Sequence, residues 1–429
     1  MTFTTLCPPS DEAPMQRIAL YSQDTHGLGR MRRNIAIARA LADEARAILL
    51  ISGAGEAAIL GLPEGADTLG LPAIENAGHP GSRCLGIGTE ALVRMRSEAL
   101  RSALAAFRPD VLIVDRLPAG VEGELRPSFE ILRRMGTRLV LGLPDVLGDH
   151  QRVWADWHAS DSIDTVRCHY DRIWVYGDPH VFDPVVEHGL PRDLRRITRY
   201  TGYLDGSQAD PAAPTRARTT RSEHRLGDGP VHVCLAGGGE DGARLAGAFA
   251  EAPLPRGSTG VVITGPFMGP DRVAELDAAA RRRDDLRVLR VLPGADTLIW
   301  LADRVIAMGG YHTTSEALAA GRRALIVPSA HGRPDQLIRA RRLQNLGAAD
   351  VLRLAEVSPR SLGEWIAADA RPPAPLASVI DTDGLSRLPV LLDELQAPVE
   401  VVPRRRASAW RPARRQVAMA GELAATAAG

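Results

Sequence analysis

Residues 308–352 read MGGYHTTSEALAAGRRALIVPSAHGRPDQLIRARRLQNLGAADVL, and this stretch decides the fold. It begins at the end of an apolar run, continues with the glycine pair Gly309 and Gly310, and enters a helical pattern rich in hydroxyl side chains. A second apolar run follows, and after a loop Asp335 and Gln336 open another helical pattern. Two successive strand–loop–helix units predict an α/β fold with parallel strands.

The polar helix starts of this stretch suit an anionic ligand. The free N–H groups of a first helical turn and the positive end of the helix dipole attract phosphate. The carboxylate of Glu316, one turn into the first helix, can accept hydrogen bonds from a ribose diol. The combination predicts a nucleotide-sugar site. Taken singly, Glu316 could merely complement the helix dipole, and Gln336 could be an exposed helical residue.

The bulk numbers limit the class of protein. A chain of 429 residues is longer than a domain with a single hydrophobic core usually is, so we expect two domains. The net charge of zero does not favour nucleic acid as a partner. The cysteines Cys7, Cys84, Cys168 and Cys234 form no CxxC pair, which favours a reducing cytosol over zinc or disulfides. We expect a cytoplasmic protein without signal peptide or membrane span, and peripheral contact with the inner face of the membrane stays open.

Ten short apolar runs predict buried parallel strands, because they are continuously apolar rather than alternating. They are residues 17–22, 47–52, 109–115, 138–143, 172–177, 231–236, 261–265, 286–292, 304–308 and 324–328. The expected fold is therefore two Rossmann-like doubly wound domains that face a central cleft. We expect a leader at 1–15, a first domain at 16–205, a linker or long loop at 206–229, a second domain at 230–370, a helix packing back on the body at 371–398, and an Arg/Ala-rich tail at 399–429 whose composition is typical of disorder.

In each half of the chain, a glycine-containing loop follows the first strand. The loop at 24–30 carries Asp24 and His26, and a histidine is a suitable general base for deprotonating a hydroxyl. The loop at 237–242 places Gly238 and Gly239 before a helix. Either loop could also be a steric strand–helix turn without a ligand.

The roles of three other residues stay open. Asp115 ends a strand, so it could contact substrate or cap a helix. Trp154 and Trp157 could line an acceptor pocket, although a core or interface role fits them better.

The 308–352 block resembles the C-terminal signature of GT-B glycosyltransferases, and is similar to the UDP-N-acetylglucosamine transferase that makes peptidoglycan lipid II. The matching positions are Gly310, Thr313, Ser315, Glu316, Val327, Pro328, His331, Asp335 and Gln336. YSQDTHGLGRMRRNIAIA, YDRIWVYGDPHVFDP and RYTGYL look like a group of bacterial predicted glycosyltransferases, and the resemblance covers roughly residues 16–355.

This sequence departs from the pattern at three positions. Arg30 stands where the family has a histidine, Asp335 replaces the first glutamine of a pair, and His312 replaces an asparagine. Either His26 or Asp24 then acts as the catalytic base, or the chain is a weakened or repurposed transferase.

The resemblance implies a GT-B fold with an acceptor-binding first domain and a donor-binding second domain. It implies that Glu316 holds the ribose, that the loop at 309–313 holds the diphosphate, that Asp335 and Gln336 touch the sugar, and that the backbone near Leu292 meets the base. The full set of expected donor-binding residues is Gly27, Gly29, Arg30, Gly238, Gly239, Glu240, Leu292, Gly309, Gly310, Tyr311, His312, Thr313, Thr314, Glu316, His331, Asp335 and Gln336.

The expected activity is sugar transfer from a nucleotide-sugar donor, with a UDP-sugar such as UDP-N-acetylglucosamine favoured by the resemblance. The acceptor is a hydroxyl of a small molecule, a glycan or a lipid-linked compound. No DxD-type carboxylate pair stands in a convincing loop, so we expect inverting transfer without a metal or cofactor, with helix dipoles and N–H groups stabilising the leaving diphosphate. Two alternatives remain, namely a nucleotide-sugar epimerase or hydrolase of the same fold, and a catalytically weakened binding partner.

Overall fold

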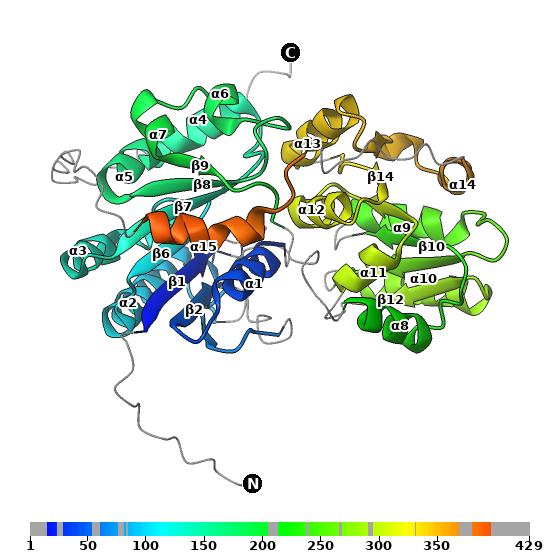
Figure 1. Cartoon of the computed structure of the whole chain (residues 1–429), viewed down its shortest axis with the longest axis horizontal. Coiled ribbons are helices and arrows are strands. Elements are labelled where there is room, and N and C mark those ends of the chain that lie inside the picture. Colours follow the sequence, from blue (N-terminus) through cyan, green and yellow to red (C-terminus); the bar gives the residue numbers. More distant parts are fainter. Residues whose placement is uncertain are drawn as a thin grey trace, which may run out of the picture.

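The computed structural model shows two α/β domains side by side (Figure 1). It describes residues 15–23, 29–53, 61–75, 81–82, 85–204, 213–236, 240–265, 268–290, 295–330, 332–368 and 380–395. Each domain is built around its own parallel sheet, which confirms the expected pair of Rossmann-like domains.

The sheet of the first domain has seven parallel strands in the order β3-β2-β1-β6-β7-β8-β9. The strands are β1 (Gln16–Ser22), β2 (Arg46–Ser52), β3 (Ala66–Gly70), β6 (Val111–Asp115), β7 (Arg138–Pro144), β8 (Arg172–Tyr176) and β9 (Thr198–Tyr200), beside a small antiparallel pair, β4 (Ile74–Glu75) and β5 (Gly81–Ser82). β1 is an inner strand of the sheet, with β2 and β3 on one side of it and β6 to β9 on the other. The strand order therefore reverses beside β1, and loops from both sides meet at its carboxyl end.

Helices cover both faces of this sheet because neighbouring residues of each strand point to opposite sides. Ile18 and Leu20 of β1 pack with α1 and α15, whereas Ala19 and Tyr21 pack with the helices of the other face. The helices of this domain are α1 (Gly29–Leu41), α2 (Thr89–Phe107), α3 (Arg126–Met135), α4 (His150–Ala159), α5 (Ser162–His169), α6 (Pro184–Glu187), α7 (Arg192–Ile197) and α15 (Gly384–Glu394), with a 3-10 turn η2 (Val121–Gly123).

The sheet of the second domain has six parallel strands in the order β12-β11-β10-β13-β14-β15. These are β10 (Val231–Leu235), β11 (Thr259–Ile263), β12 (Leu286–Leu289), β13 (Arg304–Ala307), β14 (Arg323–Ile326) and β15 (Asp350–Val351). The helices are α8 (Ala213–Glu223), α9 (Glu240–Glu251), α10 (Pro270–Arg281), α11 (Ala295–Leu301), α12 (Tyr311–Ala319), α13 (Pro334–Asn345) and α14 (Pro359–Ala367), with a 3-10 turn η3 (Leu354–Glu356). The strand order of this sheet reverses between β10 and β13, because β11 and β12 lie on one side of β10 and β13 to β15 on the other.

Two segments outside the sheets have defined positions. The polar stretch expected as a linker or long loop includes helix α8, and Leu226 just after it is fully buried in the core of the second domain. Helix α15 returns to the first domain and lies along α1 (Figure 1), where Leu388 and Leu392 are fully buried. Among the described residues, no helix is both long enough and apolar enough to cross a membrane.

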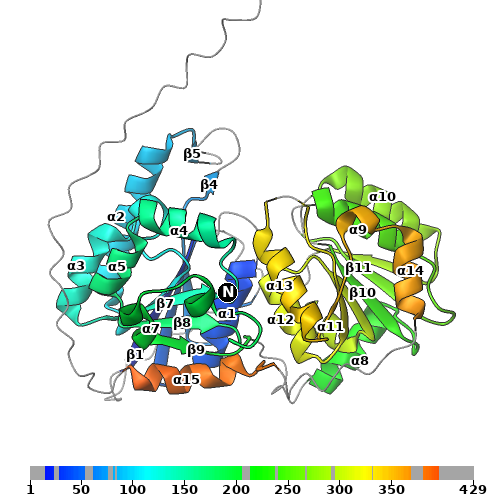
Figure 2. The ribbon, with the colours of Figure 1, turned by 90° about the horizontal axis from the view of Figure 1, so that it is seen from above.

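The domains meet through α1 on one side and α12 and α13 on the other (Figure 2). One cluster of buried apolar side chains runs continuously from α1 and α15 to Tyr311, Leu318 and Leu343 of the second domain. The two starts of α12 and α13 therefore lie at the boundary between the domains.

Candidate functional site

Three loops of the second domain converge at the carboxyl edge of its sheet. They follow the adjacent strands β10, β13 and β14. Asp241, at the start of α9, accepts hydrogen bonds from the Ser329 hydroxyl at 2.5 Å and from the Ala330 N–H at 3.0 Å, which joins the start of this helix to the segment after β14. Ligands of doubly wound sheets bind in such a place.

The middle loop brings a helix start to the domain boundary. Gly309 has a φ of +78°, and Gly310 follows as the N-cap of α12 without any side-chain cap. The N–H groups of the first turn of α12 therefore have no side-chain acceptor at the cap, which leaves them available to an anion. Thr313 is half-buried, and the buried hydroxyl of Thr314 has no partner among the described residues.

Gly309 is required by both conformation and space. Its φ lies in the left-handed region, and an added Cβ would stand 2.7 Å from Cγ2 of Ile326. We expect Gly309→Ala to destabilise the protein by about 1–3 kcal/mol, because strain and overpacking add. Gly310→Ala is the matched control, since its Cβ would meet nothing within 4 Å, and it should cost less than about 1 kcal/mol. Urea unfolding measures both, and equal losses would contradict this explanation.

Glu316 lies one turn into α12 and faces the first domain. Its side chain is 5% exposed, and Oε1 receives the Arg32 guanidinium at 3.2 Å and Nε2 of His312 at 3.0 Å. Oε2 is buried and has no partner within the described part of the chain. Burial favours the neutral acid, but the charges of His312 and Arg32 outweigh it and lower the pKa of Glu316 to about 2. The carboxylate is therefore ionised and has one oxygen free to accept hydrogen bonds.

This lowered pKa predicts a pH dependence of stability. The folded-state pKa lies below the ordinary value of 4.5, so the ion pair stabilises the protein above pH 4.5 and loses its effect as the pH falls toward 2. The wild type should lose more unfolding free energy than Glu316→Gln between about pH 5 and 2. Urea unfolding across this range measures the difference, with Glu364→Gln, whose side chain is 64% exposed, as the control. Parallel curves for wild type and Glu316→Gln would count against the ion pair.

The start of α13 supplies the other two expected sugar contacts. Burial favours neutral Asp335, but the charges of Arg339 and Arg333 hold its pKa below the usual value. The Gln336 side chain is buried, and its Oε1 accepts the Ser329 N–H at 2.9 Å. Gln336 therefore shapes the loop after β14, and its amide nitrogen is the atom left for a sugar hydroxyl.

A buried ion pair links this helix to the first domain. Arg339 of α13 donates two hydrogen bonds, of 2.5 and 2.7 Å, to the carboxylate of Asp145, which lies just after β7. The Arg339 side chain is 1% exposed and the Asp145 side chain is 0% exposed. The same guanidinium donates to the Gly309 carbonyl at 2.9 Å, and the Tyr203 hydroxyl donates to Asp145 at 2.8 Å. The first domain thus fixes the loop that precedes α12.

Tyr311 takes part in the same contact between the domains. Its ring stacks on Tyr203 with centroids 5.8 Å apart and lies beneath the guanidinium groups of Arg33 and Arg339. Its hydroxyl accepts the Leu204 N–H at 3.2 Å. The side chain is therefore used for packing, and only the backbone N–H stays at the helix start.

The first domain contributes a row of arginines. Arg33 of α1 pairs with Asp115 at the end of β6 at 2.6 Å, and both are buried. Arg116, the next residue, donates to the Leu147 carbonyl at 3.1 Å. Arg30, one helical turn before Arg33, has a buried Nη1 with no partner among the residues that the structure describes.

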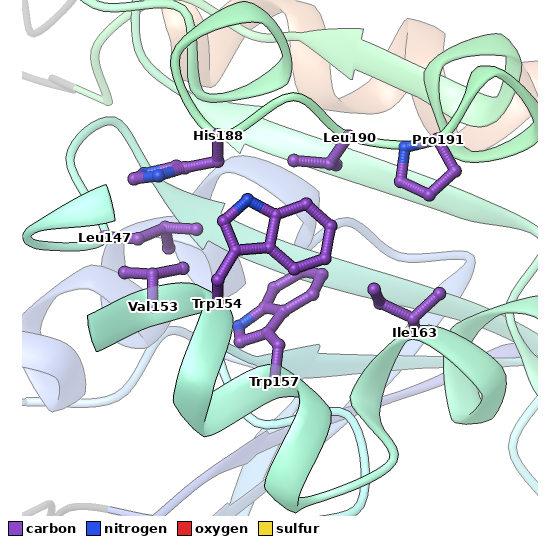
Figure 3. A pocket seen from close by; sticks show the side chains of 8 residues that line it. All are labelled: Leu147, Val153, Trp154, Trp157, Ile163, His188, Leu190 and Pro191. Carbon is purple, nitrogen blue, oxygen red and sulfur yellow. The ribbon is translucent and has the colours of Figure 1, made fainter. Parts of the chain in front are cut away.

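An apolar pocket lies elsewhere in the first domain (Figure 3). It is lined by Leu147, Val153, Trp154, Trp157, Ile163, His188, Leu190 and Pro191 and has an empty volume of about 240 Å³. Burial, reinforced by neighbouring His150, lowers the pKa of His188 to about 4, so this ring is neutral. Trp157 is buried in the apolar core of this domain and Trp154 packs against that core, which favours a packing role for the two tryptophans.

Part of the expected site lies outside the described residues: Asp24, His26, Gly27, Gly238, Gly239, Leu292, His331 and the side chain of Glu240. Gly29 is exposed, at the first position of α1. The described part of the chain contains no group of three histidine, cysteine, aspartate or glutamate side chains placed to hold a metal ion.

Sequence reasoning missed the residues that join the domains. Arg32, Asp145, Tyr203 and Arg339 had not been singled out, and their partners lie far away in the chain. Asp145 carried a usable signal, since it follows an apolar strand just as Asp115 does.

Comparison with known proteins gives the site a context. The glycosyltransferase family 28 C-terminal domain matches residues 267–392, which contain α12 and α13. Over 181 residues the chain is 29% identical to the UDP-N-acetylglucosamine–N-acetylmuramyl-(pentapeptide) pyrophosphoryl-undecaprenol N-acetylglucosamine transferase of Acidothermus cellulolyticus. This match covers 38% of the chain and 49% of that relative, so it spans about half of the relative's length.

Solved structures share the whole architecture. UGT2 of Phytolacca americana, solved with UDP-2-fluoro-glucose and pterostilbene, has a TM-score of 0.58 at 13% identity and covers 90% of this chain and 100% of its own. The structure from Listeria monocytogenes that is described as a putative UDP-N-acetylglucosamine 2-epimerase has a TM-score of 0.55 at 11% identity, with 91% of this chain and 100% of its own covered. The chain therefore has the GT-B fold, and its residues 267–392 are similar to the glycosyltransferase family 28 C-terminal domain.

Proposed function

We propose that the chain is a glycosyltransferase that moves a sugar from a nucleotide-sugar donor to an acceptor hydroxyl. The observation that supports this most is the start of α12, where uncapped N–H groups lie beside an ionised Glu316 with one free oxygen. Phosphate suits the first, and a ribose diol suits the second. Both lie at the boundary with the first domain, where an acceptor can approach.

In this proposal the residues of the second domain bind the donor. The N–H groups at Gly310 to Thr313 hold the diphosphate and stabilise the charge that grows on it as the sugar departs. Glu316 holds the ribose, Asp335 and the amide of Gln336 contact the sugar, and the backbone near Leu292 meets the base. A UDP-sugar such as UDP-N-acetylglucosamine is the favoured donor, by similarity to the relative from Acidothermus cellulolyticus.

Chemistry at the acceptor needs one base. We propose that His26, with Asp24 as the alternative, removes the proton of the attacking hydroxyl in a single inverting displacement without a metal. The acceptor hydroxyl belongs to a small molecule, a glycan or a lipid-linked compound. The protein would act at the cytoplasmic side, where it could touch the membrane peripherally.

Arg32 gives the donor site a closed resting state in this proposal. Its guanidinium occupies the carboxylate oxygen of Glu316 that faces the first domain. A ribose diol would use the free Oε2 or displace Arg32, so binding of the donor is coupled to the contact between the domains.

Product analysis tests the proposal. The protein is incubated with UDP-N-acetylglucosamine, UDP-glucose or GDP-mannose and a set of hydroxyl acceptors, and products are identified by mass spectrometry. Transfer yields a nucleoside diphosphate and a glycoside in equal amounts. An epimerase, which the Listeria monocytogenes structure keeps as the second candidate, would yield an isomeric sugar without a glycoside. A binding partner would yield neither product, and either of these results would refute transfer.

A further inference from the structure

The charges at the boundary between the domains do not cancel. Four arginines there have carboxylate partners: Arg33 with Asp115, Arg339 with Asp145, Arg32 with Glu316 and Arg333 with Asp335. Arg30 and Arg116 have no carboxylate within ion-pair distance among the described residues. Among the residues that the structure describes, Arg30 and Arg116 therefore leave two positive charges on the side of the boundary that belongs to the first domain.

These two arginines stand where a doubly wound sheet binds ligands. Arg116 directly follows β6, and Arg30 is the second residue of α1, the helix after β1. β1 and β6 are neighbours, and the order of the sheet reverses between them. The hydrogen bond to the Leu147 carbonyl holds the Arg116 guanidinium in place.

The fold bears a cost to keep Arg116 there. Its φ of +66° lies in the left-handed region, which residues other than glycine rarely adopt. Burial and the positive charge of Arg30 lower the pKa of Arg116, so the two guanidinium groups repel each other. Backbone strain of this kind clusters at functional sites, and an anion bound between the two guanidinium groups would remove their repulsion.

Nearby polar atoms also lack partners. Nη1 of Arg30, Nε of Arg33 and Oδ2 of Asp115 are buried without a hydrogen bond to any residue that the structure describes. Arg33 and Asp115 are 4% and 1% exposed, so bulk water does not satisfy them. Two charged donors and one acceptor are complementary to a phosphate group that carries a hydroxyl close by.

We propose that Arg30 and Arg116 bind a phosphate group of a substrate at this edge of the first domain. The phosphate comes either from the diphosphate of the donor or from an acceptor that is itself phosphorylated. The inference rests on the proposed function for the identity of the substrate, but the anion site itself is defined by these arginines alone.

Calorimetry with inorganic pyrophosphate tests the site in the full-length protein. We expect Arg30→Gln and Arg116→Gln each to weaken pyrophosphate binding about 10- to 100-fold, the range for hydrogen bonds to charged groups. Arg360→Gln is the control, because its side chain is 88% exposed on α14 and should leave binding unchanged. Arg30→Gln keeps the test valid if the strained position of Arg116 does not tolerate substitution.

Two further titrations separate the sources of the phosphate. If pyrophosphate still binds protein saturated with UDP, the site belongs to a phosphorylated acceptor. If UDP displaces pyrophosphate and Arg116→Gln weakens UDP equally, the site belongs to the donor. Pyrophosphate that does not bind, or binds equally to wild type and both arginine variants, overturns the proposal. Glu316→Gln should weaken UDP but not pyrophosphate, so failure of the ribose contact is distinguishable from failure of this site.

Discussion

Arg339→Ala should destabilise the protein by about 3–5 kcal/mol, because it removes the cationic partner of the fully buried Asp145 and leaves Tyr203 as its side-chain partner among the described residues. The bidentate pair is inaccessible to water, so solvent cannot take the place of the lost guanidinium. The Gly309 carbonyl loses the same donor, and the loop before α12 loses its support. Urea unfolding of the full-length protein measures the loss.

Arg342→Ala is the matched control on the same helix. Arg342 pairs with Glu187 of the first domain, but the two side chains are 44% and 37% exposed. An exposed pair is worth about 0–1 kcal/mol. A double variant, Asp145→Ala with Arg339→Ala, should lose less than the sum of the single variants, since it removes the unpaired buried charge. Equal effects of Arg339→Ala and Arg342→Ala would refute a special role for the buried pair.

His26→Ala should lower the transfer rate by about 100- to 10,000-fold, the usual contribution of a general base. Affinity for the nucleotide should stay unchanged, because His26 is proposed to contact the acceptor hydroxyl and not the nucleotide. Initial rates measure the first effect, and calorimetry with UDP measures the second.

His180→Ala serves as the control for this substitution, because the His180 side chain is 79% exposed in the first domain. Near-full activity of the His26→Ala variant would contradict the assignment of the base to His26. A large loss with Asp24→Asn would then place the base at Asp24.

The strands were predictable because both faces of a parallel sheet are covered, so most side chains of its central strands are apolar. Each of the ten apolar runs overlaps one strand, from β1 with its five buried residues to β14. β3 and β15 were not predicted because they lie at sheet edges and are half-exposed, so their sequences ADTLG and DV lack a continuous apolar run. Helix α8 was missed because APTRARTTRSE has no apolar face.

The candidate site was predictable only where its residues share a local segment. Gly309, Gly310 and Glu316 lie within one loop and helix, and their spacing alone places them together. Arg32 reaches Glu316 across 284 positions, and Arg339 reaches Asp145 across 194. Such pairs depend on how the two domains meet, which no local pattern encodes.

We expect Glu316 to bind the ribose of a nucleoside diphosphate next to the start of α12. Calorimetry with UDP and with 2′,3′-dideoxy-UDP, on wild type and Glu316→Gln, measures this contact. Wild type should bind UDP about 10- to 100-fold more tightly than the dideoxy compound, because the diol donates to a buried carboxylate, and Glu316→Gln should lose most of this preference. No affinity for UDP, GDP or ADP, or an equal preference in both proteins, would contradict it.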